Sequence, residues 1–148
     1  MDEGRADAAR ALAFEIRAPS REEEILPLAE RTLAEVRRLG FAGRGEPRLK
    51  LALIELITNA MDHGNGFDAR KAVTVSGRTR PGRRLEIAIA DEGKGLDPAL
   101  LDRDLEEIAL TAKRGRGLGI VKRILGTRPS LNAKGNVIAI EFPRDLFA

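Results

Sequence analysis

The segment Asp91-Glu92-Gly93-Lys94-Gly95 places a carboxylate and two glycines directly after a predicted strand. A carboxylate there can accept a hydrogen bond from an exocyclic amine such as that of adenine. The glycines let the backbone approach a flat ligand closely, because no Cβ intervenes. An ordinary turn after a strand has the same composition, so this segment indicates a binding site only together with others.

A second glycine-rich segment leads into a predicted helix that starts at Ile120. Free N–H groups at a helix start, together with the positive end of the helix dipole, favour an anion such as phosphate. The residues placed to meet it are Lys113, Arg114, Gly115, Arg116, Gly117, Leu118 and Gly119. The spacing of these glycines does not fit a Rossmann fingerprint, and a flexible hinge is the alternative interpretation. A Walker A loop is also excluded, because Lys94 is followed by Gly95 and not by Ser or Thr.

Between the N-terminus and these segments, residues 49–64 (LKLALIELITNAMDHG) are predicted to form a single, mostly apolar helix. Glu55 and Asn59 stand four residues apart, so they lie on one face of that helix. Asp62 and His63 continue this face by another turn. Taken alone, such a polar stripe is most often only the solvated side of a helix.

The composition fits one globular domain that binds no nucleic acid directly. The chain has 148 residues, of which 43% are apolar, and we expect a flexible terminus at residues 1–10 followed by a single domain at 11–148. The net charge of +3 comes from 26 basic and 23 acidic residues. With this near balance and without Trp or Tyr to stack on bases, a single-strand-binding surface is not expected.

Cysteine and hydropathy patterns indicate a cytoplasmic protein without a membrane partner. The absence of cysteine excludes disulfides and thiolate metal sites, and it fits a reducing compartment. No apolar run is long enough to span a bilayer, and the charged first ten residues lack the apolar core of a signal peptide.

The elements that must position these residues follow from periodicity and turn signals. Ser20 and Glu23 form a predicted capping box that opens a first helix, Gly40 ends it, and Pro27 either kinks this helix or marks its effective start. The other expected elements are strands at 12–17, 72–76 and 85–89, a turn at 80–83, a lid at 97–114, a helix at 120–125, and a hairpin of 129–133 and 137–142. This order predicts an α/β fold of the α+β, two-layer sandwich type, with a mixed, mainly antiparallel sheet and helices on one face.

The three chemical segments, in this order, resemble the N, G1 and G2 boxes of the GHKL superfamily of ATPases and kinases. Within it, Glu55-Leu56-Ile57-Thr58-Asn59-Ala60-Met61-Asp62-His63-Gly64 is most similar to the corresponding helix of the bacterial anti-sigma-factor serine/threonine kinases. The resemblance covers residues 12–142 and implies a Bergerat-type ATP-binding fold.

The resemblance also implies a role for each segment. Asn59 would hold Mg²⁺ and Asp91 would bind adenine, with Gly93 and Gly95 packed close to it. Asp62, His63 and the residues at 113–119 would line the nucleotide site, and the glycines among them would cradle the β- and γ-phosphates. Glu55, one turn before Asn59, would be the general base for a substrate serine hydroxyl.

On this resemblance, the expected function is that of an ATP-dependent anti-sigma factor with protein serine kinase activity. It would sequester a sigma factor, phosphorylate a STAS-domain antagonist and form a homodimer. Two alternatives stay open: a non-catalytic ATP-binding switch whose lid controls partner binding, and a stand-alone catalytic domain of a two-component system. Only Glu55 indicates phosphotransfer, since every other motif is expected to bind the nucleotide.

Overall fold

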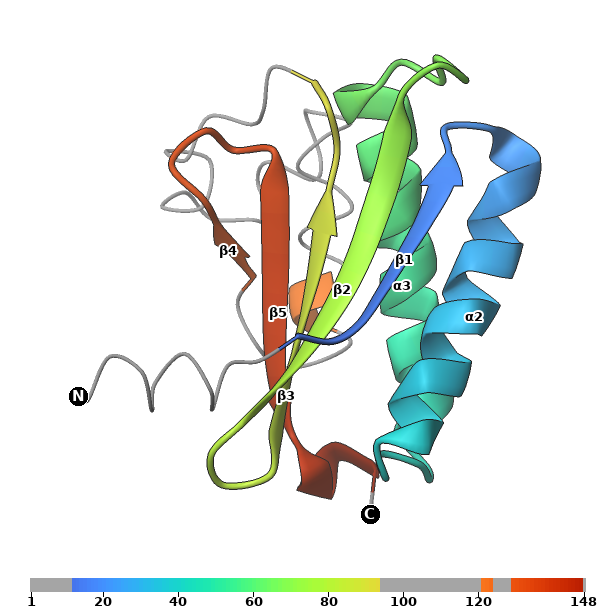
Figure 1. Cartoon of the computed structure of the whole chain (residues 1–148). Helices are drawn as coiled ribbons and strands as arrows, with labels where there is room; N and C mark the ends of the chain where they lie inside the picture. Colours follow the sequence, from blue (N-terminus) through green and yellow to red (C-terminus); the bar gives the residue numbers. More distant parts are fainter. Residues whose placement is uncertain (1–11, 94–120, 124–128, 148) are drawn as a thin grey trace.

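A sheet of five strands forms one layer of the molecule, and helices α2 and α3 lie side by side across one of its faces (Figure 1). The structure is a computed structural model that describes residues 12–93, 121–123 and 129–147. The strands are β1 (Leu12–Pro19), β2 (Ala72–Arg80), β3 (Arg84–Ala90), β4 (Ser130–Leu131) and β5 (Val137–Pro143). They are ordered β1-β2-β3-β5-β4, and each pair is antiparallel.

The period-two alternation of apolar residues forms the strands and turns one face of the sheet toward the helices. In the register of the central strands, Ile87 of β3 pairs with Gly77 of β2 and Ile140 of β5, and all three are buried. The other buried strand residues are Phe14, Ile16, Ala18, Val73, Val75, Leu85, Ile89, Ile138 and Phe142. A single slip in register would expose this whole set, so the core specifies the pairing.

Helices α2 (Ile25–Arg38) and α3 (Glu46–Asn59) cover that face with stripes of helical spacing. Their buried residues are Leu28, Ala29, Thr32, Leu33 and Val36 of α2, and Leu49, Ala52, Leu53, Leu56 and Ile57 of α3. Ion pairs of Lys50 with Glu30 and of Arg37 with Glu46 cross between the helices. Lys50 lowers the pKa of the Glu30 carboxyl, but exposed pairs of this kind contribute little to stability. The apolar stripes therefore hold the layer together.

The predicted capping box at Ser20 is wrong. A 3₁₀ turn, η1 (Glu22–Glu24), precedes α2, and no side chain caps either element at its N-terminus. Ser20 is instead fully buried, and its hydroxyl accepts a hydrogen bond from Asn65 Nδ2 at 2.7 Å. Because α2 begins at Ile25, Pro27 falls in its first turn, where the missing N–H costs nothing. The structure thus agrees better with the interpretation that Pro27 marks the effective start of the helix than with a kink.

The predicted helix at 49–64 is helical throughout, but its hydrogen bonding changes part-way. The α-helix α3 ends at Asn59, and a π-helical turn, η2 (Ala60–Gly64), continues it. The N–H of Asn65 accordingly donates to the carbonyl of Ala60, five residues back, at 2.9 Å. A π-helical turn contains about one residue more than an α-helical turn, so it changes the direction in which the following side chains point. Such turns are frequent at functional sites.

The turns of both hairpins lie where their signals predicted them, but the strand predicted at 129–133 is confined to β4, Ser130–Leu131. Residues 81–83 connect β2 and β3, where Gly82 and Arg83 have φ values of 80° and 58°. Between β4 and β5, Gly135 has a φ of 78°, and the Asn132 side-chain oxygen accepts from the N–H groups of Gly135, Asn136 and Val137. The strand predicted at 72–76 is longer and reaches Arg80, because its alternation continues through Gly77.

The predicted fold class is confirmed: a two-layer α+β sandwich with an antiparallel sheet and helices on one face. A 3₁₀ turn, η4 (Arg144–Phe147), ends the described chain, and Phe147 packs edge-on against Phe41. Residues 121–123 are helical, as expected, whereas the predicted lid at 97–114 lies outside the described residues. None of the described helices has the length and apolar character needed to cross a membrane.

Gly77 provides a test of the packing of this core. A Cβ at position 77 would lie 2.1 Å from Cε1 of the Phe14 ring, its cross-strand neighbour. Gly77→Ala should therefore lower the free energy of unfolding by about 1–3 kcal/mol, as overpacking typically does. Urea denaturation measures this change, and Ser76→Ala on the open face is the matched control, expected to stay within about 0.5 kcal/mol. Unchanged stability of Gly77→Ala would contradict the tight contact.

Candidate functional site

The last turns of α3 carry Glu55 and Asn59 one helical turn apart, and both side chains are half-buried. Asn59 Nδ2 is buried without a hydrogen-bond partner among the residues that the structure describes. Leaving such a donor unpaired costs about 1–3 kcal/mol, so native proteins rarely do it without reason. Asn59 Nδ2 is thus a buried hydrogen-bond donor for which none of the described residues supplies an acceptor.

Asp62 and His63 lie on the π-helical turn that follows, and both are half-buried. His63 Nε2 lies 3.8 Å from Asp62 Oδ2, an ion pair only when the imidazole is protonated. The four polar residues predicted on this helix are therefore confined to its last α-helical turns and the π turn.

The end of this helix is in direct contact with the segment after β3. A Cβ on Gly64 would lie 2.3 Å from Asp91 Cγ, and a Cβ on Gly93 would lie 2.0 Å from the Gly64 carbonyl oxygen. Only glycine fits at either position, because these distances are far inside van der Waals contact. The fold thus brings together the helix with Glu55 and Asn59 and the segment with Asp91.

Hydrogen bonds define the geometry of the Asp91 segment. Asp91 Oδ1 accepts from the Gly93 N–H at 2.7 Å, which closes a turn of the Asx kind. The Asp91 N–H donates to the Asn136 carbonyl at 2.9 Å, and the Glu92 N–H donates to Asn65 Oδ1 at 2.7 Å. Glu92 in turn accepts a hydrogen bond from the Ala72 N–H at the start of β2.

Asn65 and Asn136 are residues that sequence analysis missed at this site. Both sit in strings typical of turns, Gly64-Asn65-Gly66 and Gly135-Asn136, and such strings signal chain reversal only. Their contacts to residues 91 and 92 join positions 27 to 45 apart in sequence. No periodic or spacing signal could have revealed them.

The other predicted site residues lie outside the described parts of the chain. These are Gly95, Lys113, Arg114, Gly115, Arg116, Gly117, Leu118 and Gly119. The helical residues 121–123 begin two positions after Gly119, and Val121 belongs to the buried core. The predicted phosphate segment is thus connected to a residue packed in the same core as α3.

Asn59 is the residue that would hold a magnesium ion shared with a nucleotide. The amide oxygen of Asn59 is a hard ligand of the type that Mg²⁺ accepts, and Mg²⁺ usually keeps waters and phosphate oxygens as its other ligands. Over the described ranges, His, Asp and Glu do not gather in groups of three or more that could hold a metal alone.

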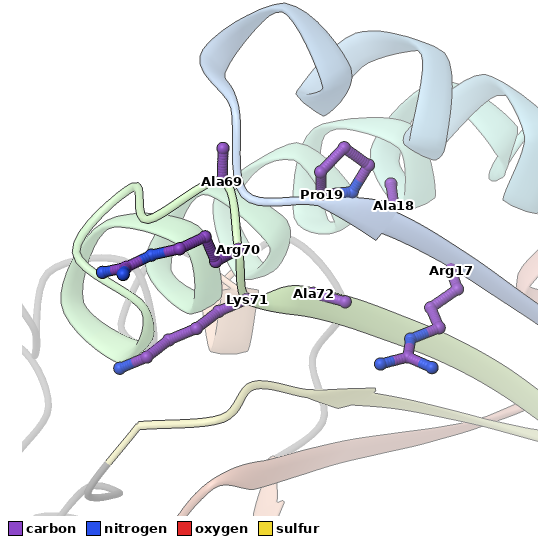
Figure 2. A pocket seen from close by; sticks show the side chains of 7 residues that line it. All are labelled: Arg17, Ala18, Pro19, Ala69, Arg70, Lys71 and Ala72. Atoms are coloured by element: carbon purple, nitrogen blue, oxygen red, sulfur yellow. The ribbon is translucent and has the colours of Figure 1, made fainter.

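A separate hollow of about 260 Å³ lies between the end of β1 and the start of β2 (Figure 2). It contains none of the predicted site residues. Figure 2 shows Arg70 and Lys71 extending to one side and Arg17 to another, so their charges do not converge on one anion. Arg70 is bonded to Asp68 at 3.0 Å, which lowers the pKa of the Asp68 carboxyl and raises that of Arg70. We assign no ligand to this hollow.

Comparison with known proteins identifies the family. A model of the histidine kinase-like ATPase domain matches residues 18–142, most of the chain. The chain belongs to this family. The comparison of this sequence with curated proteins found no match. Family membership means that it is an ATP-binding, kinase-like domain, and it agrees with the contact between the Asn59 helix and the Asp91 segment.

One solved structure supports the fold of this ATPase domain. The histidine kinase domain of the blue-light activated histidine kinase from Erythrobacter litoralis EL346 aligns with 17% identity and a TM-score of 0.52. The alignment covers 83% of this chain and 64% of that one, so this chain spans less than two thirds of that structure. The mycobacterial sensor histidine kinase MprB aligns with 16% identity and a TM-score of 0.49, over 86% of this chain and 95% of that one. At such identities the likeness concerns fold alone.

The contact between Gly93 and Gly64 can be tested by adding one methyl group. Gly93→Ala should weaken ATP binding on the order of tenfold or more, because its Cβ would push the Asp91 segment away from the helix end. Isothermal titration calorimetry with Mg-ATP measures the dissociation constant. Gly66→Ala is the control: its φ of +61° makes it strained as well, but its Cβ would meet nothing within 4 Å. Equal affinities of the Gly93→Ala and wild-type proteins would argue against this arrangement.

Proposed function

We propose that this protein is an ATP-dependent protein serine kinase that acts as an anti-sigma factor. The observation that carries the proposal is the position of Glu55 one turn before Asn59, on a helix whose end packs against Asp91. Nucleotide binding alone would need Asn59 and Asp91. A carboxylate one turn away, half-buried and beside the proposed metal ligand, adds the base that transfer to a hydroxyl requires.

The proposed reaction uses few protein groups. Asp91 accepts a hydrogen bond from the adenine amino group, and the glycines at 115–119 cradle the phosphates. Asn59 would hold a magnesium ion through its amide oxygen, and the charge that such an ion supplies would neutralise the phosphates. Glu55 takes the proton from the serine hydroxyl while the serine oxygen bonds to the γ-phosphorus. The bond from that phosphorus to the bridging oxygen breaks, and ADP leaves with the electron pair.

The proposed partners rest on the resemblance of residues 55–64 to anti-sigma-factor kinases. The phosphoryl acceptor would be a STAS-domain antagonist, and the protein sequestered would be a sigma factor. Unphosphorylated antagonist would compete for the kinase, and its phosphorylation would release the kinase to hold the sigma factor again. We further propose that the protein works as a cytoplasmic homodimer.

Glu55 separates phosphotransfer from nucleotide binding. Glu55→Gln keeps the size and polarity of the side chain but cannot accept the serine proton, so transfer should fall on the order of 10²–10⁴-fold. The dissociation constant of Mg-ATP should stay within about twofold of the wild-type value. Single-turnover transfer to a purified STAS-domain acceptor measures the first quantity and calorimetry the second. Transfer at the wild-type rate would remove Glu55 from this role.

The same transfer experiment decides between the proposed kinase and its two alternatives. Acid-stable phosphate on the acceptor supports a serine kinase, whereas acid-labile phosphate indicates a catalytic domain that acts on histidine. ATP binding without phosphate on any acceptor, in wild type and variant alike, favours the non-catalytic switch. Partner binding that depends on ATP would then be its remaining function.

Asp91 tests nucleotide binding as such. At about 100 times its dissociation constant, Mg-ATP should stabilise the folded protein by roughly 2.7 kcal/mol. For a domain of this size, the melting temperature should rise by about 2–4 °C for each kcal/mol. Asp91→Asn turns one acceptor oxygen into a donor and should abolish most of this rise, as followed by thermal denaturation. A rise that is the same in both proteins would exclude Asp91 as an adenine ligand.

A further inference from the structure

Asn65 is a buried polar residue whose side chain joins three separate segments. It is 3% exposed, and its amide forms three hydrogen bonds. Nδ2 donates to Ser20 Oγ at 2.7 Å and to the Ala72 carbonyl at 3.0 Å, and Oδ1 accepts from the Glu92 N–H at 2.7 Å. The end of β1, the start of β2 and the segment after β3 therefore meet at one side chain.

The π-helical turn places Asn65 in this position. Its N–H bonds to Ala60 with the wide spacing of that turn, and the N–H groups of Gly66 and Phe67 bond back to Asp62 and Met61. The chain then reverses through positive φ values of 61° at Gly66 and 52° at Phe67. A bulky residue in that conformation is strained, and such strain persists only where surrounding contacts hold it. The bonds of Asn65 are contacts of this kind.

Asn136 holds the same segment from the opposite flank. Its backbone carbonyl accepts from the Asp91 N–H at 2.9 Å, and its Nδ2 donates to the Asp91 carbonyl at 3.1 Å. Its own side-chain oxygen accepts from Asn132 Nδ2 at 2.9 Å, which fixes the amide. These three bonds from Asn65 and Asn136 to residues 91 and 92 each end on a backbone atom of residue 91 or 92. They therefore set the backbone from which the Asp91 carboxylate projects.

We propose that Asn65 and Asn136 are positioning residues that hold the Asp91 carboxylate where it distinguishes adenine from other purines. The inference rests on the proposed nucleotide site and names what sets its base selectivity. Both side chains are neutral amides, so they hold the segment without placing another charge beside Asp91. A carboxylate accepts a hydrogen bond from an amine but meets repulsion from a carbonyl oxygen, and this difference depends on its position.

The test compares ATP with inosine triphosphate, in which a carbonyl oxygen replaces the exocyclic amine. Dissociation constants of both are measured by calorimetry for wild type, Asn65→Ala and Asn136→Ala. The wild type should prefer ATP, and each variant should lose roughly tenfold in ATP affinity, the size of a buried hydrogen bond left unmade. Affinity for inosine triphosphate should change little, so the preference should shrink toward one.

A matched control separates positioning from general destabilisation. Thr32→Val removes the buried hydrogen bond from Thr32 Oγ1 to the Leu28 carbonyl within α2 and keeps the side-chain shape. It should lower stability without changing the ratio of the two dissociation constants. In the Asp91→Asn background, Asn65→Ala should reduce the ratio no further, because coupled residues are non-additive.

The outcomes distinguish failure of this inference from failure of the proposed function. A parallel loss of affinity for both nucleotides in the asparagine variants would overturn the inference, since it would show a purely structural role. Asn136 is half-buried, so the Asn136→Ala variant should fold. If its ratio of the two dissociation constants equals that of the wild type, the inference is overturned, even if Asn65→Ala does not fold. If the wild type binds neither nucleotide, the proposed function itself falls, and the inference falls with it.

Discussion

The close approach of Gly64 to Asp91 and Gly93 is the constraint on which the candidate site depends. Distances of 2.0–2.3 Å from hypothetical Cβ atoms to these neighbours leave no room for any side chain but hydrogen. Asp91 is proposed to bind the base of the nucleotide, and Asn59 is proposed to lie at its phosphates. The two side chains can bind one nucleotide only if their segments are in contact. The two glycines permit that contact, and the packed elements around them hold it in place.

The hydrophobic core supplies the rigid support for this contact. Helix α3 buries Leu49, Leu53 and Leu56 in the cluster to which Ile87 of β3 also belongs, so the helix and the strand have fixed positions. Both then end on the same side of the molecule, opposite the β2–β3 turn (Figure 1). A site built at the ends of packed elements keeps its geometry better than one built within a loop. Glu55 and Asn59 gain their fixed relation to Asp91 in this way.

Polar contacts take over where the apolar core ends. Ser20, Thr32 and Asn65 are the buried polar residues of the described chain, and two of them bond to each other beside the Asp91 segment. A satisfied network of this kind specifies one arrangement, because any shift leaves a buried group unpaired. Asn59 Nδ2 is the contrasting case, buried and without a partner among the described residues. Among the described residues, the groups that position the site are thus satisfied, whereas one hydrogen-bond donor at the site has no partner.

The sequence by itself determined most of the elements, and it predicted the chemistry of the candidate site. Alternating Phe14 and Ile16, the helical spacing from Leu49 onward, and the turn at Gly82 are local signals, so they predicted the strands, α3 and the hairpin. The spacing of Glu55 and Asn59 is likewise a property of one helix.

The tertiary structure alone decided the burial of Ser20, the π turn at Ala60, and the convergence of Asn65 and Asn136 on residues 91 and 92. These features depend on hydrogen bonds between distant segments. The local sequence does not indicate such partners. A Ser or Asn side chain can cap a helix, stabilise a turn or bond to a distant segment, and the groups that the fold brings near it decide which of these it does.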